Sequence, residues 1–434
     1  MLGTGLRLTE APILSRASWW LTARHRLDGI APAAILSPAS GRSMLDGKPA
    51  ADAALISRQG GAKYVIGKDG ALVQIAANTL AYDYSSGRRR LRFEGAATNS
   101  IRNSTMVGAG AGTPGSAPTN WSLVASASGL TRSIVGVGSM LGKPYIDVRW
   151  RGTIAGTASA QMDPESSMQL AGVQGQTWTH AADIALVAGA WPTTGNVYIG
   201  ITERSSAGSV IAGGNASLRG IGSALTRISH SRTLANASTA YVQPVIRFDP
   251  SADGEVVDFT VRIAAPQMEM SAAASSYIPT SGAAVTRPAD VAPLWSGAGQ
   301  ATAWAWRGSV PAPIAGQTLL GANGGPYLNA GVNDPTAVRL QGTGSVTGDR
   351  AGTLPGPVAA CFGWDAAGRR IAINTQAAIG DAVAPTYARA IMALGAVAGL
   401  AAGQILDIDE LVAWRLPDRP SAAGCQAQAR AWSA

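Results

Sequence analysis

Apolar and polar residues alternate along several stretches in the middle of the chain. Isoleucine, valine, tryptophan and phenylalanine take every second position in 145–154, 196–202 and 257–263, with mostly polar residues between them. A period of two places one row of side chains in the interior and the other in water. Strands of this kind, separated by turns rich in Gly, Ser and Pro, predict an antiparallel sandwich, and we interpret residues 105–285 as a jelly roll.

A hairpin is predicted just before this region, in a compact β segment at residues 56–104. Asp69 and Gly70 lie between two apolar runs, YVI and LVQI. An Asp-Gly pair in this setting is a strong hairpin signal because the turn requires positive φ. We therefore expect β structure to lead directly into the jelly roll.

The last third of the chain, residues 291–434, predicts a second sandwich. In its final strand the residues of one parity are apolar and are interrupted only by Glu410: Leu406, Ile408, Val412, Trp414 and Leu416. Pro417 and Pro420 then end the strand, and residues 421–432 are compatible with a helix. The expected fold class is thus all-β, with two sandwiches in series.

Composition narrows the functional class. Charged residues are only 14% of the chain and Gly numbers 53, which favours turn-rich β modules over a cytosolic enzyme. The formal net charge is +8, and residues 1–100 hold 13 Lys and Arg against 7 Asp and Glu. The remainder is nearly neutral, which argues against nucleic-acid binding by that part. The basic run Arg88–Arg90 with Arg92 predicts either a solvated hairpin end or a contact with an acidic partner.

The cysteines and the apolar segments indicate the cellular compartment of the protein. Cys361 and Cys425 are too few for a disulfide framework, and free thiols are expected, with Cys361 in the core, although the two could meet. The N-terminal sequence contains no signal peptide pattern. The longest uncharged apolar stretch, 391–403, is 13 residues, shorter than the roughly 20 that a membrane span needs.

No catalytic or metal-binding motif is found. His25, His180 and His230 are scattered and match no nucleophile, metalloprotease or zinc spacing. We therefore expect no enzymatic activity and no cofactor.

Two groups of carboxylates remain as candidates for glycoside cleavage, which uses paired carboxylates. They are Asp163 with Glu165, and Asp407 with Asp409 and Glu410. Asp407 and Asp409 are two residues apart on one strand face, where calcium ligation is an alternative. For both groups we favour ordinary surface structure.

Tryptophans are the candidate sugar-binding residues, because aromatic faces stack on sugar rings. Trp178 and Trp191 flank polar or Pro-containing turns, which predicts a surface position. Trp304 and Trp306 share one parity, so that strand face is either core or an aromatic platform. The other tryptophans considered predict core positions: Trp121, Trp150 and Trp414.

Two short segments flanking the jelly roll carry the most specific signal. The lead-in segment, residues 93–104, is FEGAATNSIRNS, and the exit segment, residues 267–290, is QMEMSAAASSYIPTSGAAVTRPAD. They resemble the segments that bracket a carbohydrate-binding-like jelly roll in fibre and spike proteins of tailed phages, prophages and gene transfer agents. The matching polar and turn positions upstream and within the lead-in are Asp69, Gly70, Asp83, Tyr84, Glu94, Thr98, Asn99, Asn103 and Ser104. We interpret their side chains as structural, because Asp and Asn at turns bond the backbone.

The C-terminal sequence resembles a second known fold, more loosely. DELVAWRL followed by residues 417–432 is similar to the last strand and trailing helix of concanavalin A-like, laminin-G-like domains. Residues 1–55 match no recognised domain, and Trp19 and Trp20 there predict a short helix or docking strand. By exclusion, we assign attachment to residues 1–55.

The resemblance implies a structural spike or fibre subunit of a phage-like particle, which binds capsular or envelope polysaccharide of the host and promotes adsorption. No long heptads or triple-β-helix shaft are found, which favours a short head spike, as on a gene transfer agent, over a long tail fibre. The alternatives are a tail-spike polysaccharide depolymerase and a free lectin-like protein.

The same resemblance sets the expected partners and location. The partners are host polysaccharide and particle proteins at a capsid vertex, spike base or tail baseplate, with neither nucleic acid nor membrane insertion. The subunit is expected to form a homo-oligomer, with a trimer as the form considered. It would be made in the cytoplasm, released by lysis and displayed on the surface of the particle.

Overall fold

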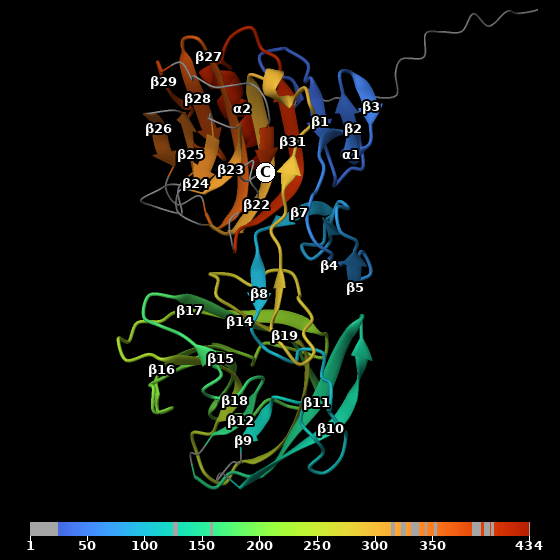
Figure 1. Ribbon diagram of the computed structural model, residues 1–434, viewed down its shortest axis with the longest axis vertical. Coiled ribbons are helices and arrows are strands. Elements are labelled where there is room, and N and C mark those ends of the chain that lie inside the picture. The colour runs from blue at the N-terminus through green and yellow to red at the C-terminus, as the bar shows by residue number, and fades with distance from the viewer. Residues whose placement is uncertain are drawn as a thin grey trace, which may run out of the picture. The chain divides into compact units, whose positions relative to one another are not determined.

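The computed structural model describes most of the chain after residue 24. The described residues are 25–124, 129–156, 159–313, 317–322, 327–330, 338–342, 345–350, 354–383, 392–394, 400 and 403–433. Nearly all of their regular structure is β (Figure 1). The all-β fold class is therefore confirmed. The element expected around Trp19 and Trp20 lies outside the described residues.

The chain forms two compact units, and each is assembled from separate stretches of sequence. The jelly-roll unit comprises residues 61–77 and 94–289. The composite unit comprises residues 1–60, 78–93 and 290–434.

The jelly-roll unit is a sandwich of two antiparallel sheets. The first has the strand order β10 (Leu130–Met140), β11 (Lys143–Thr153), β19 (Val256–Glu269), β14 (Thr177–Gly189) and β17 (Thr226–Thr233). The second has the order β16 (Val210–Ser217), β15 (Asn196–Arg204), β18 (Tyr241–Asp249), β12 (Ala160–Asp163) and β9 (Ser122–Val124), with β13 (Leu170–Ala171) also on β18. Without β9, β10 and β13, the other eight of these strands divide between the sheets, four and four, in jelly-roll order.

The predicted alternation builds the core of this sandwich. Ile146, Val148 and Trp150 on β11 are at most 1% exposed and face the inner residues of β19. The Trp150 ring stacks on Phe259 with 5.3 Å between ring centroids. Trp121 is also buried in this core, as expected. The strands predicted from the period of two are thus confirmed.

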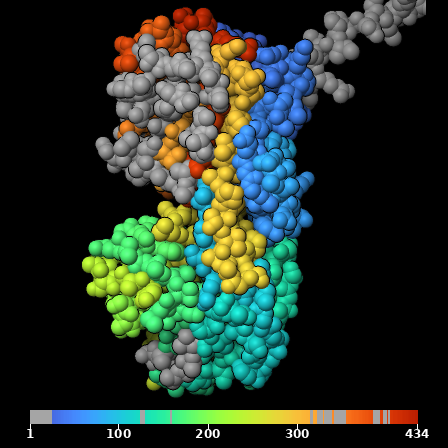
Figure 2. Space-filling model, in the orientation of Figure 1, coloured from blue at the N-terminus to red at the C-terminus, as the bar shows by residue number. Residues whose placement is uncertain are grey.

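The lead-in and exit segments form a clasp that closes the jelly-roll unit. β8 (Ala97–Asn99) pairs with β20 (Val285–Arg287), and residues 281–286 of the exit segment are exposed at the surface (gold in Figure 2). Asn99, which is fully buried, accepts hydrogen bonds from the backbone N–H of Ile101 and Met268. Its amide group donates to the carbonyls of Pro266 and Ile278 at 3.2 and 2.9 Å.

Charged and hydroxyl groups complete the clasp. The buried Glu94 carboxylate binds Lys63 Nζ at 3.1 Å and Arg287 Nη1 at 3.2 Å, and it accepts hydrogen bonds from both the backbone N–H and the hydroxyl of Ser276. Ser104 bonds Tyr277 and Thr280. The motif residues are therefore structural, as expected for this class of side chain.

The predicted hairpin is also present in this unit. β4 (Lys63–Ile66) and β5 (Leu72–Ile75) pair antiparallel, and Gly70 in the turn has φ +81°. Asp69 accepts a hydrogen bond from the N–H of Ala71, which fixes the turn. The Asp-Gly signal thus located a real turn.

The composite unit is a second two-sheet sandwich. Its larger sheet has the order β29 (Ile379–Asp381), β28 (Gly368–Ile373), β27 (Gly356–Asp365), β22 (Ala303–Ala312), β31 (Ile405–Trp414), β1 (Ala34–Leu36), β2 (Ser43–Leu45) and β3 (Lys48–Ala50), with β7 (Arg90–Glu94) on β31 and β6 (Tyr82–Asp83) on β7. The other sheet has the order β21 (Ala292–Pro293), β30 (Met392–Leu394), β23 (Thr318–Ala322), β24 (Tyr327–Ala330), β25 (Val338–Gly342) and β26 (Ser345–Arg350). The helices given for the described part of this unit are α1 (Asp52–Leu55), the short 3-10 helix η2 (Ala298–Gln300) and α2 (Ala422–Ser433).

The domain boundaries differ from those expected. Residues 25–55 are not a separate segment, because β1 pairs with β31 and places Ile35 opposite Val412. Residues 56–104 are divided as well, since β7 joins β31 while the hairpin belongs to the jelly-roll unit. The second sandwich therefore needs residues from near both ends of the chain.

A β-bulge explains the polar interruption in the last strand. Arg307 lies opposite Glu410 and Gly308 opposite Ile408, so Asp409 is an extra residue in β31. Leu406, Ile408 and Leu411 consequently face one core, whereas Val412 and Trp414 face the other side of the sheet, against α2. A bulge shifts the parity of everything beyond it, so the single apolar face inferred from the sequence is wrong.

Removing the Asn99 amide should strongly destabilise the jelly-roll unit. In Asn99→Ala, two backbone N–H groups and two carbonyls lose their partners in a buried site, at an expected cost of about 3 kcal/mol. Urea unfolding followed by tryptophan fluorescence measures the loss. The matched control is Asn215→Ala, since Asn215 is exposed and makes one long hydrogen bond, at 3.4 Å. Equal stability of the two variants would show that the clasp bonds are not structural.

Candidate functional site

The outer face of the second sheet of the jelly-roll unit is polar. Along β12, β15 and β18, apolar side chains such as Met162, Ile199 and Ile246 fill the inward positions. The residues between them lie on the opposite side of this sheet, where most are buried, and form what we call the polar face: Gln161, Asp163, Tyr198, Gly200, Thr202, Arg204, Gln243, Val245, Arg247 and Asp249.

Strand register places these side chains next to one another. Arg247 lies opposite Tyr198 on β15 and opposite Gln161 on β12, so three polar side chains span three neighbouring strands. Gly200 leaves a bare position beside Tyr198, where an added Cβ would lie 3.2 Å from the tyrosine ring. Tyr198 also donates its hydroxyl to Asp249 at 2.9 Å.

Asp163, the last residue of β12, lies on this face with one carboxylate oxygen unused. The residue is fully buried, its Oδ2 accepts a hydrogen bond from Gln161 at 3.0 Å, and its Oδ1 has no partner. Burial raises the pKa of Asp163 to about 7, although the Gln161 bond and the nearby cations Arg204, Arg247 and Arg132 oppose the rise. The carboxyl group therefore keeps its proton to a higher pH than an exposed aspartate does.

Two arginines of the polar face keep hydrogen-bond donors free. Arg247 uses Nε to bind Asp249 at 2.5 Å, and its two Nη atoms donate to none of the described residues. Arg204 donates from Nε to Gln243 and from Nη1 to the Gly208 carbonyl, both at 2.7 Å, which leaves Nη2. The site thus offers unused cationic donors beside an unused carboxylate oxygen.

The first predicted carboxylate pair is not a catalytic pair. Glu165 is fully buried and accepts hydrogen bonds from Arg102 Nη2 and Nε, at 2.6 and 3.1 Å, and from the Arg102 backbone N–H. Asp163 instead belongs to the polar face. The two carboxyl groups therefore have separate partners, and the expectation that they are ordinary surface residues is wrong for both, since both are buried.

The second group is an internal ion-pair cluster. The Asp407 carboxylate is fully buried and binds Arg90 Nη1 and Arg92 Nε, both at 2.8 Å. Burial raises its pKa, but Arg92 and Arg90 outweigh burial and lower the pKa below the usual value. Asp409 lies 3.9 Å from Arg90. No group of metal-ligating side chains is found in the described residues, so calcium binding by Asp407 and Asp409 has no support.

This cluster also shows what the arginines of the basic run bind. Arg90 and Arg92 bind an acid of the same chain, and Arg89 donates to the Pro38 carbonyl at 3.0 Å and covers the Tyr82 ring. The run is therefore neither simply solvated nor available as a whole to an outside partner.

The four tryptophans proposed for sugar binding do not form open platforms. Trp178 is only 7% exposed, because β14 begins at Thr177 and carries the ring into the core with Ile201 and Met268. Trp191 is half-buried, lies 5.8 Å from the Phe259 ring and donates to the Ile221 carbonyl. The prediction of a surface position is therefore wrong for Trp178. It is also largely wrong for Trp191, because that ring is half-buried.

Trp304 and Trp306 are core residues as well. Trp304 is 0% and Trp306 2% exposed, and both lie among the apolar side chains between the sheets of the composite unit. Of the two possibilities left open for this strand face, the structure selects the core. Trp414 is likewise buried.

The histidines and cysteines show no catalytic arrangement in the described residues. His25 is buried against Glu410 at 3.0 Å. His180 donates from Nδ1 to the Gly200 carbonyl, and burial lowers its pKa to about 3, which keeps it neutral. Cys361 and Cys425 are free and buried, and the Cys425 thiol donates to the Cys361 carbonyl.

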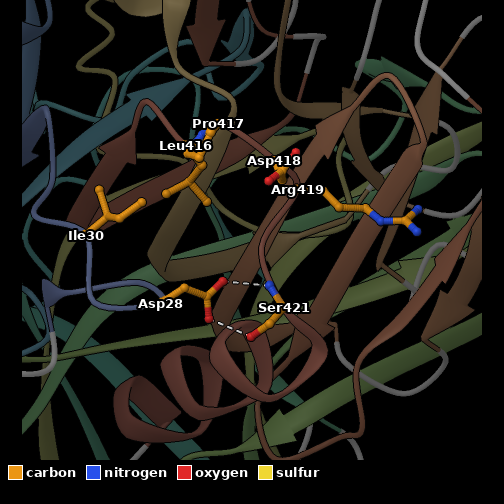
Figure 3. Close-up of a pocket in the computed structure, with 7 residues that line it drawn as sticks. All are labelled: Asp28, Ile30, Leu416, Pro417, Asp418, Arg419 and Ser421. Atoms are coloured by element: carbon orange, nitrogen blue, oxygen red, sulfur yellow. Dashed lines mark hydrogen bonds between the residues drawn. The ribbon is translucent and has the colours of Figure 1, made fainter.

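A pocket of about 380 Å³ lies at the start of α2 in the composite unit (Figure 3). The Asp28 carboxylate accepts hydrogen bonds from the N–H and hydroxyl of Ser421 at 2.6 and 2.5 Å. Ser421 in turn accepts a bond from the N–H of Gly424, which is an N-cap. Figure 3 shows Arg419 pointing away from Asp28, and its Nη1 donates to the carbonyls of Ala367 and Asp381 at 3.0 and 2.8 Å.

A smaller pocket of about 210 Å³ lies over the clasp of the jelly-roll unit. Tyr64 and Tyr277 line it, with ring centroids 6.4 Å apart. Its two cationic side chains, Lys63 and Arg287, already bind Glu94. This pocket therefore offers less free chemistry than the polar face.

Among the described residues no helix is long and apolar enough to cross a membrane. The residues that sequence reasoning missed are Tyr198, Arg204, Gln243, Arg247 and Asp249. Their only signal is the polar parity of two strands, β15 and β18, whose other parity is apolar. That signal predicts a solvent face but not a binding face.

Replacing Asp163 should change how stability depends on pH. The folded state holds the Asp163 proton more tightly than the unfolded chain, so stability contributed by this group is lost as pH rises from about 4 to about 7. Asp163→Asn removes that loss. The difference in free energy of unfolding between the variant and the wild type should therefore shift by about 2 kcal/mol in favour of the variant from pH 5 to pH 8. Urea unfolding of both proteins at the two pH values measures it, and an unchanged difference would contradict the buried carboxyl assignment.

Asp28→Ala should lower the free energy of unfolding by about 1 kcal/mol, because the N–H and the hydroxyl of Ser421 at the start of α2 each lose their acceptor. Thermal unfolding measures the effect. The matched control is Asp418→Ala in the same pocket, because Asp418 is exposed and makes no hydrogen bond or ion pair with the described residues. If both variants lose the same stability, the cap is not the cause.

Comparisons with known proteins leave the family open. No protein-family model matches the chain, and no curated protein matches it. One similar solved structure is the CBM22-1 xylan-binding domain of Paenibacillus barcinonensis, with 10% identity, a TM-score of 0.23, and coverage of 42% of this chain and 99% of that one. The CBM22-1 and GH10 modules of a Clostridium thermocellum xylanase match with 9% identity and a TM-score of 0.24, over 43% of this chain and 30% of that one. The baseplate tripod of bacteriophage Tuc2009 matches with 9% identity and a TM-score of 0.25, over 68% of this chain and 99% of that one. TM-scores this low carry no argument about this chain.

Proposed function

We propose that this protein is a structural spike or fibre subunit of a phage-like particle, and that its polar face binds polysaccharide of the host envelope without cutting it. One observation carries the binding role. The unused Asp163 Oδ1 lies on the same sheet face as the unused Nη donors of Arg204 and Arg247.

This combination suits the hydroxyl groups of a sugar. Each hydroxyl both donates and accepts, so it can donate to a carboxylate oxygen and accept from a guanidinium at the same time. Hydrogen bonds to charged groups are also the stronger kind, at roughly 1.5–3 kcal/mol each. A sugar bound here would satisfy the buried Asp163 oxygen, which is costly to leave unpaired.

The absence of cleavage is part of the proposal and has its own support. A glycoside hydrolase uses two carboxyl groups on either side of one bond. Glu165 is held by Arg102, and Asp407 is held by Arg90 and Arg92. Neither predicted group keeps a free pair of carboxylates, so the depolymerase alternative gains no support from them.

The particle role rests on the lead-in and exit segments, whose sequences resemble those of phage and gene-transfer-agent fibres and spikes. We place the subunit as a short head spike, exposed on the particle and released by lysis. It forms a homo-oligomer, with a trimer as the simplest form, and attaches to a capsid vertex, spike base or tail baseplate. Several copies on one particle would raise avidity by about 10²–10⁴-fold over a weak single site.

Particles without this protein should adsorb poorly to encapsulated cells while their heads remain intact. Restoring the protein as Arg247→Gln should leave adsorption low, since the free guanidinium is lost, and should weaken binding of purified protein to extracted capsule about 10-fold. Adsorption counts and biolayer interferometry measure these effects.

The matched control is Arg149→Gln. Arg149 is also paired with one acid at 2.5 Å, but it lies on the first sheet of the jelly-roll unit, away from the polar face. Normal adsorption by particles without the protein would refute the binding role. Release of reducing sugar ends from capsule by the wild type would establish the depolymerase alternative instead.

A further inference from the structure

On the polar face, more positive than negative charge is free to bind a ligand. Asp249 is already used by Arg247 and by the Tyr198 hydroxyl. Asp163 makes no ion pair with the described residues, although three arginines lie near enough to affect its carboxyl group. The cations outnumber the acids that could neutralise them.

These charged groups come from several elements packed around Asp163. The positive charges that act on its carboxyl group are those of Arg204 on β15, Arg247 on β18 and Arg132 on β10, and Gln161 on β12 donates a hydrogen bond to it. Arg132 donates to the Gln161 carbonyl at 2.8 Å, which holds it at the edge of the face. Tyr198 and Asp249 complete the surroundings.

Arg204 and Arg247 also disfavour each other. Burial lowers the pKa of the Arg204 guanidinium, Asp163 opposes this, and Arg247 lowers it further. An anion bound between two positive charges reduces the electrostatic repulsion between them. The terminal donors of Arg247 form a planar fork of the kind that matches a carboxylate in a bidentate manner.

We infer that the polar face takes an acidic sugar unit, whose carboxylate is held by Arg247 and Arg204 and whose hydroxyl groups reach Asp163. This inference rests on the proposed function and narrows it from polysaccharide in general to uronate-containing polysaccharide. Arg247 is 26% exposed and its partner Asp249 is 34% exposed, whereas Asp163 is fully buried, so a carboxylate would meet Arg247 before Asp163.

The site should also couple binding to a proton. A bound carboxylate places a second negative charge near Asp163, which favours the neutral form of that side chain. Binding therefore takes up a proton, and affinity should fall as pH rises from 6 to 8. Because the groups that face Asp163 are arginines, an amide and the hydrogen-bonded pair Tyr198 and Asp249, we assign this pH dependence to Asp163 itself.

The experiment uses the purified full-length chain and two matched pairs of ligands. NMR titration compares methyl glucuronide with methyl glucoside, and methyl galacturonide with methyl galactoside. At least one uronide should bind about ten-fold more tightly than its neutral partner. Arg247→Gln and Arg204→Gln should each remove that preference, whereas Arg149→Gln should keep it. Asp163→Asn should keep the preference and remove its decline between pH 6 and pH 8.

The outcomes separate this inference from the proposed function. Equal affinity for both members of each pair would overturn the acidic-sugar inference and leave polysaccharide binding standing. Binding of none of the four ligands, with no binding of extracted capsule, would overturn sugar binding by this face altogether. A uronide preference that survives both Arg247→Gln and Arg204→Gln would place the anion elsewhere and also overturn the inference.

Discussion

The hydrogen bonds of Asn99 join the two ends of the jelly-roll sequence and so close the sandwich that lies between them. A buried polar group needs a partner, because leaving it unpaired costs more than a hydrogen bond gains. Asn99 meets this constraint by binding four backbone groups, one at Ile101 and three in or directly before the exit segment, at Pro266, Met268 and Ile278. Glu94 does the same with Lys63, Arg287 and Ser276. The family-like motif is thus a set of partners for otherwise unpaired groups.

The same constraint distinguishes structural polar residues from those that can bind a ligand. Asp407 and Glu165 are as deeply buried as Asp163, yet each is surrounded by guanidinium donors. Asp163 has a single amide partner and one unused oxygen. Other buried atoms also lack partners, among them Nε2 of His180, but that atom lies within the sandwich, whereas Asp163 lies on an outward strand position. Position and partner count together identify the polar face.

Local sequence pattern predicted the strands well and the site poorly, for a physical reason. The period of two in 145–154 and the Asp-Gly turn at 69–70 depend on neighbouring residues, so both could be predicted. The pairing of Ile35 with Val412 depends on residues far apart in sequence, and nothing local indicates it. The bulge at Asp409 shows the same limit, because one extra residue changes which side chains share a face. Tryptophans beside turn-like sequence were therefore misplaced, as the burial of Trp178 illustrates.

Charge in the sequence gave equally incomplete information until partners were known. Arg90 and Arg92 formed the densest basic run, and Asp407 with Asp409 formed a prominent acidic group. In the fold these two groups neutralise each other within one sheet. Arg204 and Arg247 looked unremarkable by comparison, because each stands alone in an alternating strand. Their significance comes from strand pairing, which places both on one face with Asp163 and leaves Nη2 of Arg204 and both Nη atoms of Arg247 unused. For a chain with so few charges, the informative ones are those that the fold brings together without letting them pair.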